Sequence, residues 1–483
     1  QLTDIRIVST ITEIGDNAFS GCTQINYTVE PESSSYLTDA QGVLYDSKMQ
    51  TLLAVPAVMT GEYVVPDTVT VITPGVFQNS LVSKVTLPEA ITEIGEEMFA
   101  NTPNLTEVEM LGNITYIGKS AFAGSAIQKI TIGKYVTKID ESAFDGCTNL
   151  QEVTFEKGGN SGLQIIKYAF RGCTSLQSIE LPRRVRNVET YNSYGNISSV
   201  TAGVGESCFE GCTSLSSVTF EQTGAWLLKE ALSLGKSAFK NCTSLQSISI
   251  PDYVYTRAIG SSYGTTYYYG LSDYCFSGCT ALNSVVFEGY DQSTSYYIGA
   301  YVFENCTALR SIEIPSTLYM VSNTKGLFSG CTALEEAVFS GNGWSYSTDQ
   351  LIFKGCSALK KVTITGGISG AIGMNAFVDC PELETVQVTG EINYIGKSAF
   401  KGCTKLQSFV VPETCLTIYD NAFEGCTGLT GLTLGASLKT INAEAFKDCT
   451  GLQTVTISRY VATIGEGVFD GCTALTAIEV AEE

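Results

Sequence analysis

Residues 464–475 read Ile464-Gly465-Glu466-Gly467-Val468-Phe469-Asp470-Gly471-Cys472-Thr473-Ala474-Leu475, and the chain continues with Thr476-Ala477-Ile478-Glu479-Val480. The same order of an Ile, a Phe, a Gly-Cys pair and a Leu returns at residues 395–406 and again at residues 139–150. One such unit is too small to enclose its own apolar side chains, whereas stacked copies bury them along a continuous core. The sequence therefore predicts an array of stacked coils.

The phenylalanine of this unit sets the period of the array. From Phe377 to Phe469 every step is 23 residues, which lies within the roughly 20 to 29 residues of leucine-rich repeats. Leu475, Ile478 and Val480 occupy the first, fourth and sixth places of the leucine-rich pattern, whose strand lines the concave side of a horseshoe. The anchors fall at seventeen positions: Phe19, Phe77, Phe99, Phe122, Phe144, Phe170, Phe209, Phe239, Phe276, Phe303, Phe328, Phe353, Phe377, Phe400, Phe423, Phe446 and Phe469.

We accordingly expect an α/β repeat fold, a right-handed solenoid with one short parallel strand in each coil of about 23 residues. The segment Gly-x-x-Ala-Phe-x-Gly-Cys is too short for an independent helix, so we expect a short helical turn that buries the Phe and the Cys. The whole chain, residues 1–483, should form one solenoid. Its parts are extended early repeats at 1–76, regular coils at 77–176, coils with tyrosine-rich insertions at 177–302, and regular coils at 303–483.

The repeated pattern Ile-Gly-x-x-Ala-Phe-x-Gly-Cys-x-x-Leu-x-x-Ile-x-Ile-Pro resembles the BspA-like, or treponemal, class of leucine-rich repeats over residues 1–480. The stretch from Gly42 to Tyr45 and on to Pro66 is similar to the extended early repeat of that family. The resemblance implies a bacterial surface protein associated with adhesion to host matrix proteins and to other cells. It does not identify a ligand, because function resides in sites and not in the fold.

Composition narrows the possible functions. A net charge of −21 disfavours nucleic acid and anionic membranes as partners, because binding either requires clustered Lys and Arg. The chain has no His, which excludes Ser-His-Asp and Cys-His nucleophiles and His-ligated zinc. Carboxylate pairs remain possible, as in glycoside hydrolysis, but no pattern of acids points to one. We expect no cofactor and no metal, and no regular Asp ladder suggests calcium.

Fourteen of the 17 cysteines occupy one position of the repeat, and their recurrence is architectural: Cys22, Cys147, Cys173, Cys212, Cys242, Cys279, Cys306, Cys331, Cys356, Cys380, Cys403, Cys426, Cys449 and Cys472. A disulfide framework is the alternative, but such frameworks serve small secreted domains. We expect buried free thiols that pack as small apolar side chains. Cys208 and Cys275 replace the usual Ala before Phe, which favours core filling over a metal site.

Each expected strand carries polar residues at its outward places, including Ser178 with Glu180, Ser247 with Ser249, Ser311 with Glu313, Thr385 with Gln387, and Thr454 with Thr456. Ser and Thr suit solvent-facing strand positions, so these rows need no functional explanation. Docking of a glycan or an extended peptide on them is the alternative.

The middle coils are longer than the 23-residue period, with steps of 39, 30, 37 and 27 residues between Phe170 and Phe303. The extra residues precede the next Ile-Gly or its equivalent, so we expect the insertions to emerge on one side of the stack as a ridge. The inserted segments are rich in Tyr, Ser and Gly, as are the binding loops of antibodies, which favours a binding role. The alternative interpretation is that the tyrosines pack on one another and hold the insertions in place. The candidate binding residues are Tyr191, Tyr194, Tyr253, Tyr255, Tyr263, Tyr267, Tyr268, Tyr269, Tyr274, Tyr290, Tyr296, Tyr297, Trp344 and Tyr346.

These features together favour a non-catalytic extracellular recognition or adhesion module on a bacterial cell surface. Its expected partner is a protein or glycan of a host or neighbouring cell, and the module is expected to be a monomer. A structural spacer that presents another domain is the alternative, and a carboxylate-based glycan-active enzyme is a third. No run of 18 apolar residues occurs and Gln1 falls in mid-pattern, so we expect a fragment without its signal peptide or anchor and without direct membrane insertion.

Overall fold

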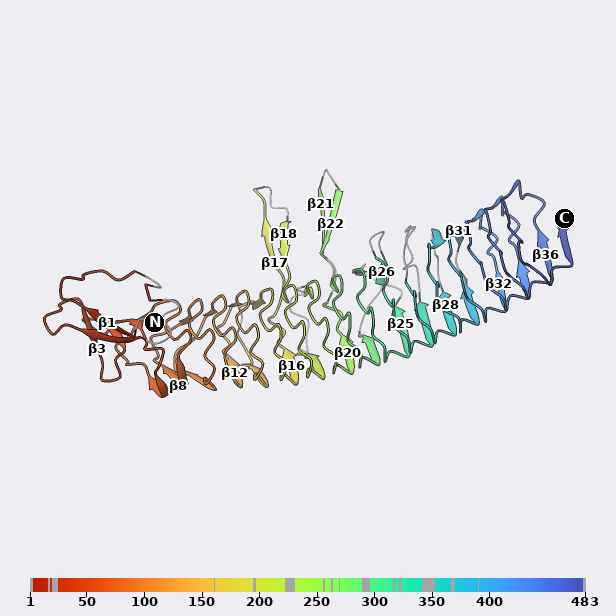
Figure 1. The fold of residues 1–483 in the computed structure, drawn as a ribbon. Helices are drawn as coiled ribbons and strands as arrows, with labels where there is room; N and C mark the ends of the chain where they lie inside the picture. The colour runs from red at the N-terminus through yellow and green to blue at the C-terminus, as the bar shows by residue number, and fades with distance from the viewer. Residues whose placement is uncertain are drawn as a thin grey trace. The chain divides into compact units, whose positions relative to one another are not determined.

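A computed structural model describes residues 3–15, 18–19, 25–159, 161–193, 197–221, 231–254, 257–261, 264–268, 270–288, 296–315, 318–320, 324–340, 352–365, 370–389 and 391–480. The chain divides into two compact units, Gln1–Leu232 and Ser233–Glu483. Each unit is a leucine-rich-repeat solenoid of stacked coils with parallel strands (Figure 1).

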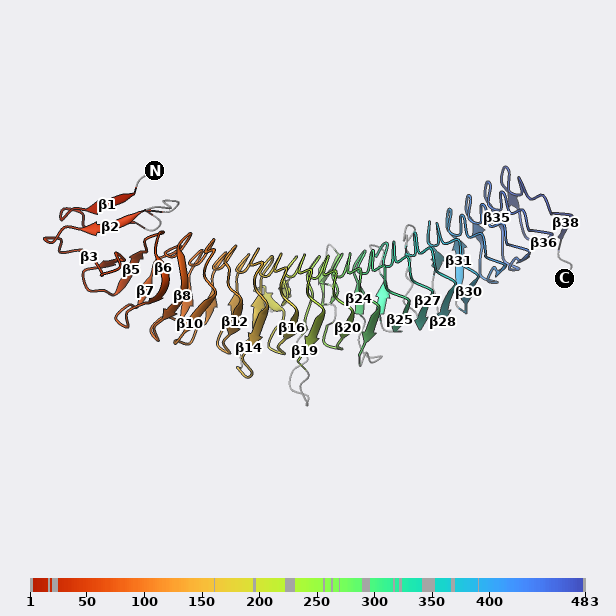
Figure 2. The same cartoon turned by 60° about the horizontal axis from the view of Figure 1, so that its bottom comes forward.

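In the first unit the longer strand of each coil forms what we name the wide face, shown in Figure 2. It holds one sheet of β6 (Thr60–Val64), β8 (Leu81–Leu87) and β10 (Glu107–Met110), and the adjoining strands β12 (Lys129–Ile132), β14 (Glu152–Phe155), β16 (Ser178–Leu181) and β19 (Ser217–Phe220). A second parallel sheet, the narrow face, consists of β9 (Glu93–Ile94), β11 (Tyr116–Ile117), β13 (Lys138–Ile139) and β15 (Gln164–Ile165).

The second unit repeats this arrangement. Its wide face contains β20 (Ser247–Ile250), β23 (Ser284–Phe287), β25 (Ser311–Pro315), β27 (Glu336–Ser340), β28 (Lys361–Thr365), β30 (Thr385–Val388), β32 (Ser408–Val410), β34 (Gly431–Thr433), β36 (Thr454–Ile457) and β38 (Ala477–Val480). Its narrow face contains β24 (Tyr296–Ile298), β26 (Leu318–Met320), β29 (Gly370–Ile372), β31 (Ile392–Ile395), β33 (Thr417–Ile418), β35 (Thr440–Ile441) and β37 (Thr463–Ile464).

The expectation of a single strand per coil was therefore incomplete, because the Ile of the Ile-Gly pair belongs to a strand of its own. In the coils around Ile117 and Ile139, for example, the narrow-face strands pair residue for residue, Tyr116 with Lys138 and Ile117 with Ile139. These strands are only two residues long, which is too short to show an alternating pattern in the sequence.

The early repeats depart from the parallel pattern. β3 (Tyr36–Thr38), β4 (Leu44–Asp46) and β5 (Thr51–Ala54) pair antiparallel, and β7 (Val71–Ile72) joins them in parallel. β1 (Asp4–Ile7) pairs with β2 (Asn26–Val29). The anchor Phe19 packs here against Tyr27 in a tilted arrangement, outside the column of stacked phenylalanines.

The prediction of stacked anchor phenylalanines is confirmed within each unit, from Phe77 to Phe209 in the first and from Phe239 to Phe469 in the second. In the first unit the rings of Phe122, Phe144 and Phe170 follow each other at 4.9 Å between centroids, with interplanar angles of 5° and 2°. In the second unit Phe400 lies between Phe377 and Phe423 at 5.0 and 4.9 Å. Offset stacking at this spacing adds to the burial of each ring.

The predicted helical turn is wrong, since no helix occurs in the described residues. Around Phe144 the amides of Ala143, Asp145 and Cys147 each donate to the carbonyl three residues earlier. The amides of Ser142, Phe144 and Gly146 donate instead to carbonyls of the next coil. In an α-helix all of these amides would donate within the helix. Here every second amide donates to the next coil, so these hydrogen bonds connect neighbouring coils. Ser142 and Gly146 have φ of 57° and 71°, as the third residue of a type II turn requires.

The repeated cysteines form a ladder of hydrogen bonds. Their burial is confirmed for every described member, Cys22 lying outside the described residues. The Sγ of Cys147 donates to the carbonyl oxygen of Phe122, one coil earlier, at 2.9 Å. Equivalent bonds to the preceding phenylalanine carbonyl, at 3.1 to 3.3 Å, are made by Cys173, Cys212, Cys279, Cys306, Cys331, Cys356, Cys380, Cys403, Cys426, Cys449 and Cys472.

We predict that these thiols are reduced and unreactive in the native protein. Burial raises the pKa of the Cys147 and Cys279 thiols to about 12, so the nucleophilic thiolate is scarce at neutral pH. Titration with an aromatic disulfide reagent should detect few thiols before denaturation and nearly all 17 after denaturation without reductant. Disulfides between successive coils, found by mass spectrometry of the unreduced protein, would contradict this prediction.

Candidate functional site

An antiparallel hairpin interrupts the solenoid of the first unit. β17 (Val188–Tyr191) pairs with β18 (Ile197–Thr201) in the longest insertion, between β16 and the next narrow-face position. Figure 1 shows it projecting from its unit on the side opposite β16. Tyr191 is 60% exposed, and its hydroxyl donates to Glu189 at 2.8 Å. This hairpin therefore presents an aromatic ring to solvent with its hydroxyl held in place.

Hydroxyl groups stabilise the same hairpin from within. The Oγ1 of Thr190 lies 2.9 Å from the Oγ of Ser198 and 2.7 Å from the Oγ of Ser199. Ser198 also donates to the Thr190 carbonyl at 3.2 Å. These hydrogen bonds between the two strands stabilise the pairing of β17 with β18.

The second unit carries a similar hairpin. β21 (Arg257–Ser261) pairs antiparallel with β22 (Gly264–Tyr268), in a register that places Tyr267 opposite Ala258 and Tyr268 opposite Arg257. The pairing extends to Ser261, which lies opposite Gly264. In Figure 1 this hairpin projects from its unit on the side opposite β20.

Tyr274 has a different setting from the hairpin tyrosines. It lies in the turn just before the anchor Phe276, where its ring stacks on Tyr301 at 5.0 Å between centroids and 8° between planes. The Lys240 ammonium group lies 5.7 Å from the centroid of the Tyr274 ring. This pair contributes to packing between coils, as the alternative interpretation of the tyrosines anticipated.

The other predicted site residues are dispersed. Tyr253 is half-buried in the turn after β20, and Tyr296 and Tyr297 belong to the narrow-face strand β24, which pairs with β26. The structure therefore places the described tyrosines in hairpins, in turns and in a narrow-face strand. Seven predicted residues lie outside the described part of the chain: Tyr194, Tyr255, Tyr263, Tyr269, Tyr290, Trp344 and Tyr346.

The wide face is lined by polar rows, as the sequence predicted. In β16, Ser178 and Glu180 are exposed whereas Ile179 and Leu181 are buried. Ion pairs bridge neighbouring strands, for example Lys84 with Glu107 at 3.0 Å and Lys129 with Glu152 at 3.1 Å. Such exposed pairs add little stability individually, but they hold the charged side chains of this surface in defined positions.

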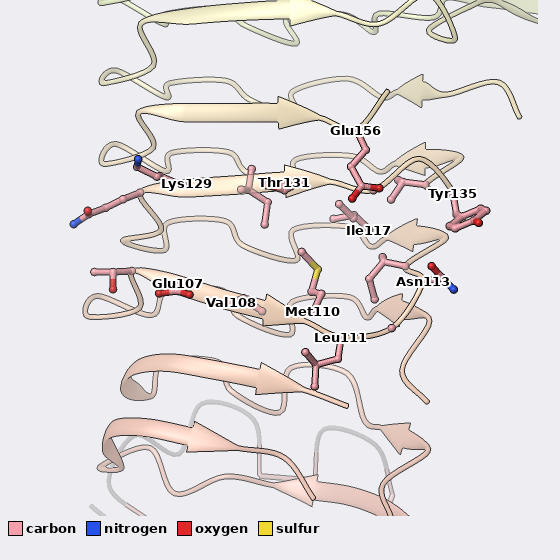
Figure 3. A pocket seen from close by; sticks show the side chains of 17 residues that line it. Glu107, Val108, Met110, Leu111, Asn113, Ile117, Lys129, Thr131, Tyr135 and Glu156 are labelled. Atoms are coloured by element: carbon pink, nitrogen blue, oxygen red, sulfur yellow. The ribbon is translucent and has the colours of Figure 1, made fainter. Parts of the chain in front are cut away.

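A hollow of about 600 Å³ interrupts the wide face of the first unit between β10 and β12 (Figure 3). Met110, Leu111 and Tyr135 line it together with Glu156, and Leu111 and Tyr135 are 52% and 47% exposed. Sequence reasoning missed this site. Its signal was the apolar pair Met110-Leu111 at the end of a strand, where most coils carry a single apolar residue followed by a polar residue, Pro or Gly.

The described residues contain no group of three or more potential metal-ligating side chains. The carboxyl pKa values that are shifted there are lowered, as for Glu152 by its hydrogen bond from Lys129 and for Glu335 by its hydrogen bond from Lys360. A general acid requires the opposite shift. In the same residues, no helix is long and apolar enough to cross a bilayer.

Stacked parallel coils with an anchor phenylalanine and a leucine-rich strand define a leucine-rich-repeat solenoid protein. The model of the BspA type leucine rich repeat region matches residues 1–52, 70–192, 158–259, 269–407 and 370–483 in 6 copies. The chain belongs to this family, which confirms the resemblance. The family comprises bacterial surface proteins that are generally protein-binding or adhesive and typically non-catalytic.

Solved structures with similar folds include a leucine-rich repeat protein from Bacteroides ovatus, 21% identical over 89% of this chain and 90% of that one, with a TM-score of 0.47. A leucine-rich cell surface protein from Faecalibacterium prausnitzii is 18% identical over 94% and 95%, with a TM-score of 0.36. The pneumococcal vaccine antigen PcpA is 12% identical over 93% and 99%, with a TM-score of 0.36. No match was found among curated proteins.

Proposed function

We propose that this chain is a non-catalytic recognition and adhesion module displayed outside a bacterial cell. Its partner in this proposal is a protein or glycan on a host or neighbouring cell, and the module acts as a monomer. The observation that carries the proposal is the pair of antiparallel hairpins, β17–β18 and β21–β22, inserted into coils that are otherwise parallel. Membership of a family that generally binds proteins supports it.

The physical argument rests on how rigid scaffolds carry recognition. Binding residues concentrate on loops that a stable framework positions, and such loops tolerate extra length. Tyr supplies a large contact area with few rotatable bonds. Tyr191 shows the required exposure, and Tyr267 and Tyr268 lie on the strand of the other hairpin. A protein that serves only as a spacer has no need of either insertion.

The tyrosine hypothesis is tested in two stages. The chain is first screened on arrays of glycans and matrix proteins to identify a ligand. Tyr191, Tyr267, Tyr268, Tyr296 and Tyr297 are then replaced individually by Ala. If aromatic anchors dominate, several of these changes should each weaken binding by about 1 to 2 kcal/mol, which is roughly five- to thirtyfold in Kd.

Tyr460→Ala provides the matched control, because Tyr460 is 62% exposed on a regular coil that has no insertion. Its replacement should leave binding unchanged, and all variants should keep the melting temperature of the parent. Binding that survives the hairpin changes but falls on replacement of Thr385, Gln387 and Thr454 would move the site to the wide face. A chain that binds nothing on the arrays would favour the spacer.

A further inference from the structure

The parallel pairing of the wide face is interrupted at one place in the first unit. β10 pairs with β8, and β12 pairs with β14, but within residues 25–159 no strand pairing joins β10 to β12. The two strands start together, since the amide of Gln128 donates to the carbonyl of Thr106 at 3.3 Å. They then diverge toward their C-terminal ends, as Figure 3 shows. The result is a wedge that opens onto the surface.

Apolar side chains line the open end of this wedge. Figure 3 shows Met110 directed from β10 toward β12 and Tyr135 at the corner after β12, whereas the Leu111 side chain at the end of β10 is directed away from β12. Ile117, from the narrow-face strand behind, is only 1% exposed. The hollow of about 600 Å³ can therefore accommodate one or two large apolar side chains.

The charge at this end of the wedge is negative. Glu156 lines the wedge and also a neighbouring hollow of about 270 Å³, whose other charged residues are Glu152, Glu180, Glu221 and Lys157. Four carboxylates and the Lys157 ammonium group thus line the second hollow. The Arg184 guanidinium, which donates to the carbonyls of Gly133 and Val136, partly balances Glu156 and Glu221. The cationic residue of the wedge itself, Lys129, lies at its closed end and is ion-paired with Glu152.

We propose that the wedge and the adjoining acidic hollow bind an extended basic peptide segment of a partner protein. An apolar side chain of the segment occupies the space between Met110 and Tyr135. A neighbouring Lys or Arg pairs with Glu156 or Glu180, and the peptide backbone follows the unpaired edge of β10 or β12, as in β-strand addition. This surface is separate from the hairpin tyrosines and goes beyond the function proposed above.

The carboxylates favour a basic peptide over nucleic acid. Nucleic acid would bring phosphates toward Glu156 and Glu180, which is repulsive. An extended peptide with alternating side chains presents backbone groups, apolar groups and cations at once, which matches the three features of the wedge.

The test uses the whole chain and a short fluorescein-labelled peptide of alternating lysine and leucine, with binding followed by fluorescence anisotropy. The control peptide alternates glutamate and leucine. We expect saturable binding of the lysine peptide and none of the glutamate peptide. The variants Met110→Ser and Glu156→Gln with Glu180→Gln should each weaken binding by about tenfold, which corresponds to about 1.4 kcal/mol.

Two matched variants separate this site from general attraction to an acidic protein. Glu313 lies in β25, whose Ser-Ile-Glu sequence repeats that of Glu180 in β16, so Glu313→Gln is the control for charge. Val410 is 66% exposed on β32, so Val410→Ser is the control for apolar area. Both should leave the affinity within about twofold, or 0.4 kcal/mol.

Equal effects of the test and control variants, or equal binding of both peptides, would overturn the proposal. Thermal melts followed by circular dichroism confirm that each variant is folded. The hairpin variants Tyr191→Ala and Tyr267→Ala should leave binding of the lysine peptide intact. Failure of this proposal is therefore distinguishable from failure of the tyrosine hypothesis.

Discussion

Replacing Phe400 by Ala should lower the free energy of unfolding by about 3 to 5 kcal/mol, through the lost transfer of the ring from water and the cavity left behind. Phe400 is fully buried, and its ring lies between those of Phe377 and Phe423 with Phe409 tilted against it at 5.0 Å. Urea denaturation followed by circular dichroism measures the loss.

The last anchor of the column provides the comparison. Phe469 stacks on Phe446 at 5.7 Å and is only partly buried. Phe469→Ala should therefore cost distinctly less than Phe400→Ala, because fewer contacts are lost and a cavity open to solvent fills with water. Equal losses at the two positions would contradict the packing described here.

Alkaline pH should unfold the protein through its thiol ladder. Burial raises the pKa of the Cys331, Cys380 and Cys449 thiols to about 12 from an ordinary value of 9.0. Because the folded pKa exceeds the unfolded pKa, the stabilisation is complete below about pH 9 and is lost as the pH rises toward 12. Each such thiol removes about 1.4 kcal/mol per pH unit in that window, so several together should cause a steep loss.

The alkaline prediction is checked by urea denaturation at pH 7, 9, 10 and 11, alongside thiolate absorbance in the ultraviolet. The midpoint should be nearly constant up to pH 9 and then fall, and thiolate should appear together with loss of the circular dichroism signal. Thiolate that forms near pH 9 while the strands persist would show that the ladder is accessible to solvent.

The buried core was the most predictable part of the molecule. The anchor phenylalanines and ladder cysteines occupy the same environment in every regular coil, so their identity recurs with the period and the sequence reveals it directly. Phe144 and Phe400, for example, have equivalent neighbours although they lie in different units. The fold could be predicted from the repeat period, whereas the secondary-structure propensities of single residues would not have predicted it.

Features that depend on hydrogen bonding between coils were not predictable. The turn around Phe144 has the composition of a helical turn, but amides such as that of Gly146 donate to the next coil and prevent a helix. The wedge beside Met110 and Tyr135 depends on the divergence of two strands, which no single coil encodes. The insertions were recognised by their length, but the antiparallel pairing of β17 with β18 requires the structure.

The constant spacing of the regular coils allows the gene to gain or lose whole repeats without disrupting the fold. From Phe377 to Phe469 each period contains 23 residues, and each coil contacts only the coils beside it. Gain or loss of one complete period by recombination between similar DNA segments would join compatible coils and leave every phenylalanine and cysteine in place. Loss of a single codon would instead displace one anchor from its column. Such a gene can change the length of the solenoid by whole coils while the inserted hairpins are preserved.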